Sequence, residues 1–186
     1  MTATTSGEPR RPPRPLAARV WAYRHFWWLA VTVFVLDQLT KAWIVHGSGY
    51  ALGVLPPASG TVVIPGVFNL IYTVNYGAAW SLGEGLGWVF VIVAVIVLAA
   101  IYRFRRALEL IRLPYQVAFG LIVGGIVGNA LDRVLRGHVV DFLDFDLQFY
   151  RWPTFNLADG GIVVGTCWML LYSLLLDKPG RATNGG

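Results

Sequence analysis

Residues 120–133 read GLIVGGIVGNALDR, and residues 155–159 read FNLAD. The first stretch closes an apolar segment and the second opens another. At 1.5 Å per residue, a helix that begins near Tyr115 places Asp132 roughly 25 Å along its axis, and Asp159 lies roughly 25 Å from a helix end near Leu176. Consecutive spans are antiparallel, so we expect both carboxyl groups near one face of a hydrocarbon layer about 30 Å thick.

The composition is that of an integral membrane protein. Of 186 residues, 56% are hydrophobic and 13% are charged, with a mean hydropathy of +0.58. A soluble domain of this length carries more charge. Four apolar runs can each cross a bilayer, at about Phe26–Val45, Leu86–Tyr102, Tyr115–Leu131 and Ala158–Leu176. We therefore expect an all-α membrane protein with one four-helix transmembrane domain over residues 21–176.

The net charge of +5 does not indicate a nucleic-acid partner, because of where the charges lie. Basic residues precede the first run, separate the second from the third and follow the fourth, whereas residues 47–85 contain no Lys or Arg. The positive-inside rule places both termini and the loop 103–112 in the cytoplasm, and Asp132 and Asp159 at the outer face. Residues 1–20 and 177–186 are expected to be disordered cytoplasmic tails.

Two outer-face segments connect the spans. In the first, about residues 47–82, Thr61–Ile64 and Val67–Val74 are rich in β-branched and aromatic residues, which predicts paired strands in a small β-cradle. The second, about residues 136–156, mixes apolar, acidic and aromatic residues and is expected to lie in the membrane interface.

The helices themselves are expected to differ in role. Gly120, Gly124 and Gly128 predict that a neighbouring helix packs closely on the third span. The second span is uniformly apolar until its end, which is typical of a scaffold helix that faces lipid.

Each acidic residue has a structural and a functional interpretation. Asp37 and Lys41 share a helix face and are expected to pair, either to lock the helices or to contact substrate. Asp132 could pair with Arg133 or Lys41, and Asp159 could be an acidic residue in the first turn of a helix whose N-cap is Asn156. The matched depth of Asp132 and Asp159, each with an Asn three residues before it, favours catalysis.

Two carboxyl groups at hydrogen-bond distance share a proton, so one can activate water while the other protonates a leaving amine. This aspartic-protease chemistry requires no metal and no cofactor. The helix dipole predicts that the resting proton lies mainly on Asp132 and that Asp159 is the initial base.

Other functions fit the sequence less well. The three histidines, His25, His46 and His138, are too scattered for a metal site. A Ser81–Lys41 hydrolase is disfavoured because Lys41 beside Asp37 should stay protonated. The non-catalytic alternatives are a small proton-coupled transporter subunit, whose carboxyl groups should lie at staggered depths, and a structural membrane scaffold.

Five motifs, in order along the chain, resemble those of bacterial lipoprotein signal peptidase (signal peptidase II), an intramembrane aspartic protease family. They are Asp37-Gln38-x-Thr40-Lys41, Asn75-x-Gly77-Ala78-Ala79, Gly124-Gly125-x-x-Gly128-Asn129-x-x-Asp132-Arg133, Val140-Asp141-Phe142 and Phe155-Asn156-x-Ala158-Asp159. The resemblance runs from the first span to the fourth and omits only the tails.

The resemblance implies four transmembrane helices, an extracytoplasmic β-cradle and an Asp132–Asp159 dyad at the outer face of the bacterial cytoplasmic membrane. The implied substrate is a prolipoprotein whose signal peptide is removed just before a diacylglyceryl-modified Cys. Membrane lipid and globomycin-type inhibitors are implied as further partners, and we expect a monomer. The residues expected to bind substrate or support the site are Asp37, Lys41, Asn75, Gly77, Asn129, Arg133, Asp141, Asn156 and Ala158.

Overall fold

The four apolar runs fold as long helices in the computed structural model, which describes residues 20–77 and 85–176. The helices are α2 (Arg24–Ala42), α3 (Gly87–Phe104), α4 (Leu113–Arg136) and α5 (Leu157–Leu171); α2 continues into the π-helical turn η1 (Trp43–Gly47) and α5 into η3 (Tyr172–Leu176). Each of the four is long and apolar enough to cross a membrane, which confirms the four predicted spans. Residues 1–19, 78–84 and 177–186 lie outside the described part, and with them Ser81 and nearly all of both predicted tails.

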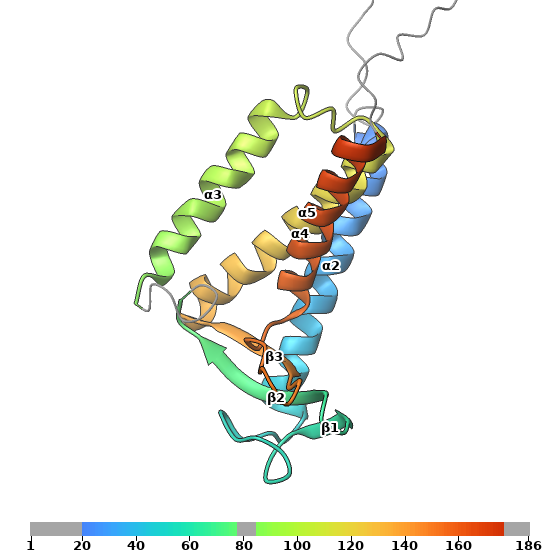
Figure 1. Ribbon diagram of the computed structural model, residues 1–186. Helices are drawn as coiled ribbons and strands as arrows, with labels where there is room; N and C mark the ends of the chain where they lie inside the picture. The colour runs from blue at the N-terminus through green and yellow to red at the C-terminus, as the bar shows by residue number, and fades with distance from the viewer. Residues whose placement is uncertain (1–19, 78–84, 177–186) are drawn as a thin grey trace, which may run out of the picture.

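The basic residues and the strands occupy opposite ends of the bundle. Figure 1 shows the start of α2, the α3–α4 connection and the end of α5 together at one end, with the sheet at the other. Arg24 begins α2, Arg103 lies in the last turn of α3 and Arg112 caps α4, so these arginines mark the end away from the sheet.

Helix α4 packs on α2 and α5 through glycines. A Cβ atom added at Gly120 or Gly124 would lie 2.9 or 2.6 Å from a backbone oxygen of α2, and one added to Gly165 of α5 would lie 2.6 Å from a backbone oxygen of α4. These distances leave no room for a methyl group, so the helix backbones touch. The packing predicted from the glycine spacing is confirmed.

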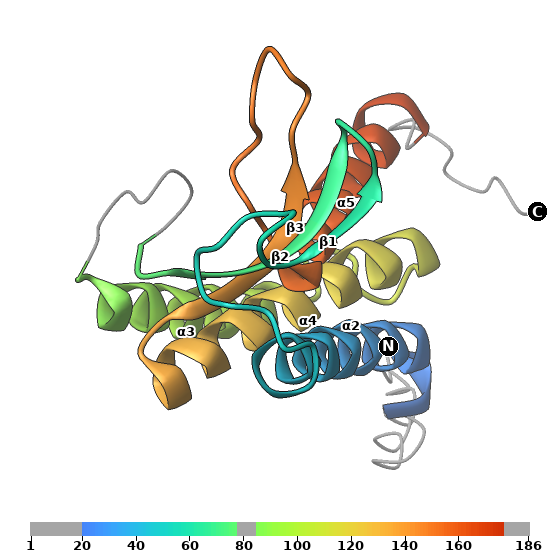
Figure 2. The same ribbon diagram turned by 90° about the horizontal axis from the view of Figure 1, so that it is seen from below.

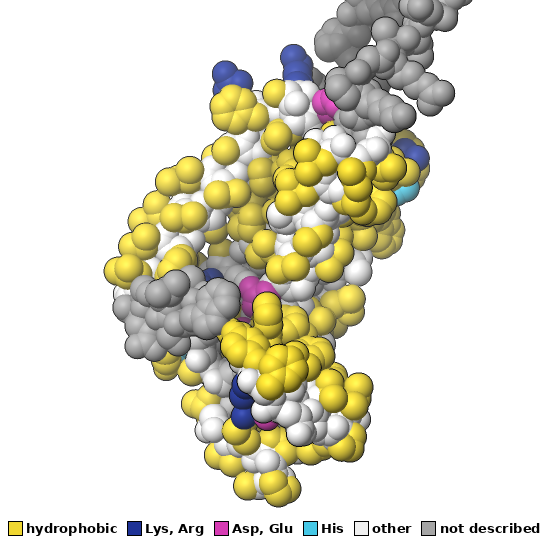
Figure 3. All heavy atoms as spheres, viewed as in Figure 1, with side chains coloured by type: hydrophobic (Ala, Val, Ile, Leu, Met, Phe, Trp, Pro, Cys, Tyr) yellow, Lys and Arg dark blue, Asp and Glu magenta, His cyan; other side chains and the backbone are white. Residues whose placement is uncertain are grey.

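Helix α3 contributes little to this core. Of its side chains only Ile101 is buried, and its Val and Ile residues are largely exposed. Hydrophobic side chains cover the outside of the helices (Figure 3). In a bilayer this surface contacts lipid, as expected for a scaffold helix.

Three antiparallel strands form the sheet in the order β1 (Thr61–Ile64), β2 (Phe68–Asn75), β3 (Val139–Phe145). The pairing of the first two strands was predicted. The third strand was not, because residues 136–156 were expected to lie in the interface. Instead Val139–Phe142 are buried, and the backbone N–H groups of Phe142 and Leu143 donate to Phe155. Within residues 136–156, the exposed aromatic residues follow β3, beginning with Phe149.

Candidate active site

A buried ion cluster joins α2 to α4 and α5. Lys41 Nζ lies 2.8 Å from Asp37 Oδ2 and 2.9 Å from Asp132 Oδ2, and all three side chains are fully buried. Lys41 also donates to Asn129 Oδ1 at 3.0 Å. Asp37 Oδ1 accepts a 3.0 Å hydrogen bond from Ala158 N, one of the free backbone donors at the start of α5. For the Asp37–Lys41 pair, these contacts favour the structural interpretation over a substrate contact.

Both oxygens of Asp132 are occupied. Oδ1 pairs with Arg136 and accepts from Gln38 Nε2 at 3.1 Å, while Oδ2 accepts from Lys41 and from Val140 N at 3.3 Å. A carboxylate offers about four acceptor positions, and these contacts use them all. One carboxyl group thus contacts two cations, Arg136 at Oδ1 and Lys41 at Oδ2.

Asp159 lies at the start of α5, in a capping box with Asn156. Asp159 N donates to Asn156 Oδ1 at 3.0 Å, and Asn156 N donates to Asp159 Oδ2 at 3.3 Å. The other carboxyl oxygen, Oδ1, accepts from Asn129 Nδ2 at 2.7 Å. Asp159 is thus held by amide groups, with no ion pair among the contacts that the described chain provides.

Asp141 reaches the same place from β3. Its Oδ1 accepts from Asn156 Nδ2 at 2.7 Å, and the Asn75 side chain also hydrogen-bonds it. Asn156 therefore contacts both Asp141 and Asp159. Burial, followed by the negative charge of Asp159, raises the pKa of Asp141 to about 7.

Asn129 connects this carboxyl pair to the ion cluster. Its Oδ1 accepts from Lys41 at 3.0 Å and from Asn156 Nδ2 at 3.1 Å, while its Nδ2 donates to Asp159. The amide orientations of both asparagines are thereby fixed, because each oxygen faces donors and each nitrogen faces acceptors.

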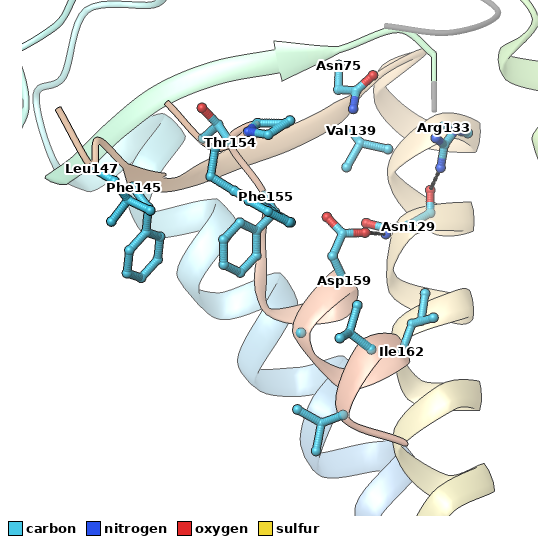
Figure 4. Close-up of a pocket in the computed structure, with 15 residues that line it drawn as sticks. Asn75, Asn129, Arg133, Val139, Phe145, Leu147, Thr154, Phe155, Asp159 and Ile162 are labelled. Atoms are coloured by element: carbon cyan, nitrogen blue, oxygen red, sulfur yellow. Dashed lines mark hydrogen bonds between the residues drawn. The ribbon is translucent and has the colours of Figure 1, made fainter. Parts of the chain in front are cut away.

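A cavity of about 760 Å³ opens beside Asp159, between α4, β3, the β3–α5 connection and α5. Asp159 points from α5 toward Asn129, below the strand that carries Val139 and close to Asn75 (Figure 4). Val139 and Phe145 of β3 line the cavity, and Asp141 lies on the same face of the strand because side chains alternate. Among the described residues, neither Asp141 nor Asp132 itself lines the cavity.

Arg133 forms one wall of the cavity. Its guanidinium donates to Asn129 O at 3.2 Å and to Gly77 O at 2.7 Å, and it lies 5.0 Å from the ring centre of Phe90. Its buried Nε has no partner among the described residues. Arg133 thus connects Gly77, which follows β2, to α4.

Residues 29–175 match the family model described as signal peptidase (SPase) II. The chain belongs to this family. Lipoprotein signal peptidases of Psychromonas ingrahamii and Symbiobacterium thermophilum are 39% and 40% identical to it over 156 and 154 residues, which are 81% and 83% of this chain and 85% and 97% of theirs. That of Thermosynechococcus vestitus is 42% identical over 146 residues, 78% of this chain and 88% of its own.

Solved structures agree with the assignment. Two structures of bacterial membrane enzymes, determined by the in meso method at 2.3 and 1.9 Å resolution, superpose with TM-scores of 0.72 and 0.65. Their identities are 31% and 32%, and they cover 92% and 88% of this chain and 95% and 96% of their own. The chain is a lipoprotein signal peptidase, an aspartic endopeptidase that cleaves signal peptides from prolipoproteins. The transporter and scaffold alternatives are set aside.

Most residues expected at the signal peptidase site lie together in space. The ion cluster contains Asp37, Lys41 and Ala158. The cavity and the Asp141–Asp159 carboxyl pair beside it are formed or contacted by Asn75, Asn129, Arg133, Asp141, Asn156 and Asp159. Gln38 and Arg136, which bind Asp132, were missed as individual residues. The signal for Arg136 was its i, i+4 spacing from Asp132 on one helix.

Proposed function

We propose that Asp141 and Asp159 are the catalytic dyad of this lipoprotein signal peptidase. The observation that carries the proposal is that one residue, Asn156, contacts both carboxyl groups: its side-chain Nδ2 donates to Asp141 Oδ1 and its backbone N–H donates to Asp159 Oδ2, beside the cavity that Asp159 lines. The sequence prediction paired Asp159 with Asp132 instead. Because four donors already fill the acceptor positions of Asp132, we assign it to the support of the site.

The two carboxyl groups differ in a way that suits acid–base catalysis. With a pKa of about 7, Asp141 holds a proton in much of the population at neutral pH. Asp159 takes a proton from a water molecule, whose oxygen attacks the scissile carbonyl while Asp141 donates a hydrogen bond to the carbonyl oxygen. The proton then passes to the leaving nitrogen as the C–N bond breaks, and the dyad again shares one proton.

Asp132 acts on this dyad through the backbone. Its Oδ2 holds the N–H of Val140, the residue before Asp141, and Lys41 holds both Asp132 and Asn129. The ion cluster therefore fixes the position of Asp141 and, through Asn129, that of Asp159.

The cavity suits a substrate that comes from the membrane. Val163 and Val164 of α5 line it and are each 59% exposed, so its wall continues into the lipid-facing surface. A signal peptide can move along this surface until its scissile bond, just before the diacylglyceryl-modified Cys, reaches the dyad, with the acyl chains against apolar walls. Globomycin-type inhibitors would occupy the same space, and one chain carries every residue of the site, consistent with a monomer.

The orientation follows from the charges. With the arginine-rich end in the cytoplasm, both termini are cytoplasmic, and the sheet and dyad lie at the outer face of the bacterial cytoplasmic membrane. Residues 21–176 then form one peptidase domain. Water reaches the dyad from the outer side.

The test is cleavage of a diacylglyceryl-modified precursor peptide by purified protein in lipid nanodiscs. Asp141→Asn and Asp159→Asn should each lower kcat by at least about a thousandfold, because each removes a proton donor or acceptor that the reaction requires. Asp132→Asn keeps one of the two acceptor oxygens and should retain measurable turnover, with a lower melting temperature.

The opposite pattern would refute this assignment. If Asp141→Asn cleaved at nearly the wild-type rate while Asp132→Asn was inactive at an unchanged melting temperature, the dyad would be Asp132 and Asp159, as the sequence alone predicted.

A further inference from the structure

Gly160 has no packing reason to be glycine. It follows Asp159 on α5 and lines the cavity, and a Cβ atom added to it would meet no atom of the described chain within 4 Å. Its neighbour Gly161 differs, since a Cβ there would lie 3.0 Å from Val33 Cγ1 and 3.1 Å from Leu121 O. Helix packing therefore explains Gly161 and leaves Gly160 unexplained.

The backbone does not require glycine at this position either. Gly160 lies within α5, and its N–H donates to Asn156 O at 3.1 Å in the regular helical pattern. Its φ is not in the left-handed region that favours glycine. Glycine is a poorer helix former than alanine, so the missing side chain weakens the helix without an internal benefit.

The space over Gly160 lies on the membrane side of the dyad. Val163 and Val164, three and four residues further along α5, share its helix face and line the same cavity. A signal peptide that spans the bilayer approaches along these valines and reaches Gly160 just before Asp159. Adjacent Cα atoms are about 3.8 Å apart, so a group above Gly160 is next to the scissile bond.

We propose that Gly160 is a specificity-determining residue. Its missing side chain leaves room for the substrate side chain that immediately precedes the scissile bond. This proposal rests on the proposed function of the cavity. According to this proposal, the residue at position 160 limits the size of that one substrate side chain and does not select the lipid.

The experiment uses precursors that carry the same diacylglyceryl-modified Cys and have Gly, Ala or Val immediately before it. The full-length enzyme in nanodiscs is compared with Gly160→Ala and Gly160→Val. The ratio of kcat/KM for the Gly precursor to kcat/KM for the Val precursor should rise by at least about tenfold in Gly160→Val. The new valine side chain of the enzyme would fill the space that the methyl groups of the substrate valine require. Gly160→Ala should give an intermediate ratio and a melting temperature equal to or above that of the wild type.

Gly161→Ala is the matched control. It should lower the melting temperature and reduce cleavage of all precursors by the same factor, because its methyl group displaces α2 and α4. An unchanged ratio in Gly160→Val would overturn the proposal, as would a preference that follows acyl-chain length instead of the preceding residue. Asp141→Asn in the same assay reports separately on the dyad, since the ratio does not depend on which carboxyl groups react.

Discussion

At the scale of residues, the acidic side chains near the sheet fall into two chemical groups. Asp37 and Asp132 contact cations in a fully buried cluster. Asp141 and Asp159 contact asparagine side chains and backbone N–H groups instead. The first two carboxyl groups are therefore bound by Lys or Arg side chains, whereas the other two are held by neutral amide groups.

Activity should depend on pH through Asp141. In the proposed mechanism the protonated form of Asp141 polarises the carbonyl, so kcat/KM should decline as the pH rises through about 7, the value to which burial and Asp159 raise the pKa of Asp141. The measurement is kcat/KM for one lipidated precursor between pH 5 and 9, in nanodiscs of uncharged lipid. A profile that stays flat from pH 6 to 9 would contradict this assignment.

Stability provides the control for that pH dependence. The folded state binds the Asp141 proton more tightly than the unfolded chain does. The contribution of Asp141 to the free energy of unfolding is therefore fully present below its ordinary pKa of 3.8 and is lost as the pH rises toward about 7. The melting temperature of the wild type should therefore fall between pH 5 and 8 more than that of Asp141→Asn. Equal slopes would show that Asp141 does not titrate in this range.

The sequence predicted most of the residues that the structure brings together here, but not that Asn156 contacts both Asp141 and Asp159. Depth along two antiparallel helices placed Asp132 and Asp159 at one end of the bundle, as observed. Equal depth in the membrane does not determine in which direction a side chain points from its helix, however, and the Asp132 side chain points toward Lys41 on α2. Asp141 could not be placed beside Asp159 because the strand that carries it was not predicted.

At the scale of elements, regular patterns were predictable and β3 was not. The helices and the β1–β2 pair follow hydrophobic runs and turn residues. In β3, acids occupy buried positions: Asp141 is 3% exposed and Asp144 is fully buried. In a sequence, acidic residues normally indicate an exposed position. Here their burial is possible because of tertiary partners, which are Asn156 for Asp141 and Arg151 for Asp144.

The glycine contacts of α4 can be tested by substitution. Gly124→Val should destabilise the protein by on the order of 1–3 kcal/mol, because its Cβ would lie 2.6 Å from a backbone oxygen of α2. The measurement is the melting temperature in detergent. The control is Ala99→Val, because Ala99 is exposed on α3 and the added apolar atoms would meet only the surrounding detergent. This variant should change the melting temperature little. Similar losses in both variants would argue against close α2–α4 packing.

At the scale of the whole molecule, an aromatic loop projects from the sheet beside the cavity. Figure 2 shows the β3–α5 connection extending next to the β1–β2 turn, and Asp146 N donates to Val67 O between them. Phe149 is 88% exposed in this loop. Arg151 holds the loop to the sheet through two hydrogen bonds to Asp144, of 2.8 and 2.6 Å. Exposed aromatic side chains at this level favour the membrane interface.

A spin label at position 149 should therefore report lipid contact. Cys167 is the single cysteine, so Cys167→Ser gives a background for Phe149→Cys and, as a control in the loop before β1, Ala58→Cys. In liposomes the label at position 149 should collide more often with oxygen than with a water-soluble nickel chelate. The label at position 58 should collide more often with the nickel chelate than with oxygen. Equal access of the nickel chelate to both labels would place the loop in water.

The Asp37–Lys41 salt bridge also bears on how the chain is made. Synthesis delivers α2 to the bilayer long before Asp132 and Ala158 exist. A charged side chain at the centre of a span costs about 2.5–3.5 kcal/mol on insertion, so two unmatched charges would hinder the first helix. Because the pair lies one turn apart on the same helix, α2 can enter as an electrically neutral unit and wait for the later helices. The lysine that orders the finished site thus first serves as the counter-ion that allows its own helix to insert.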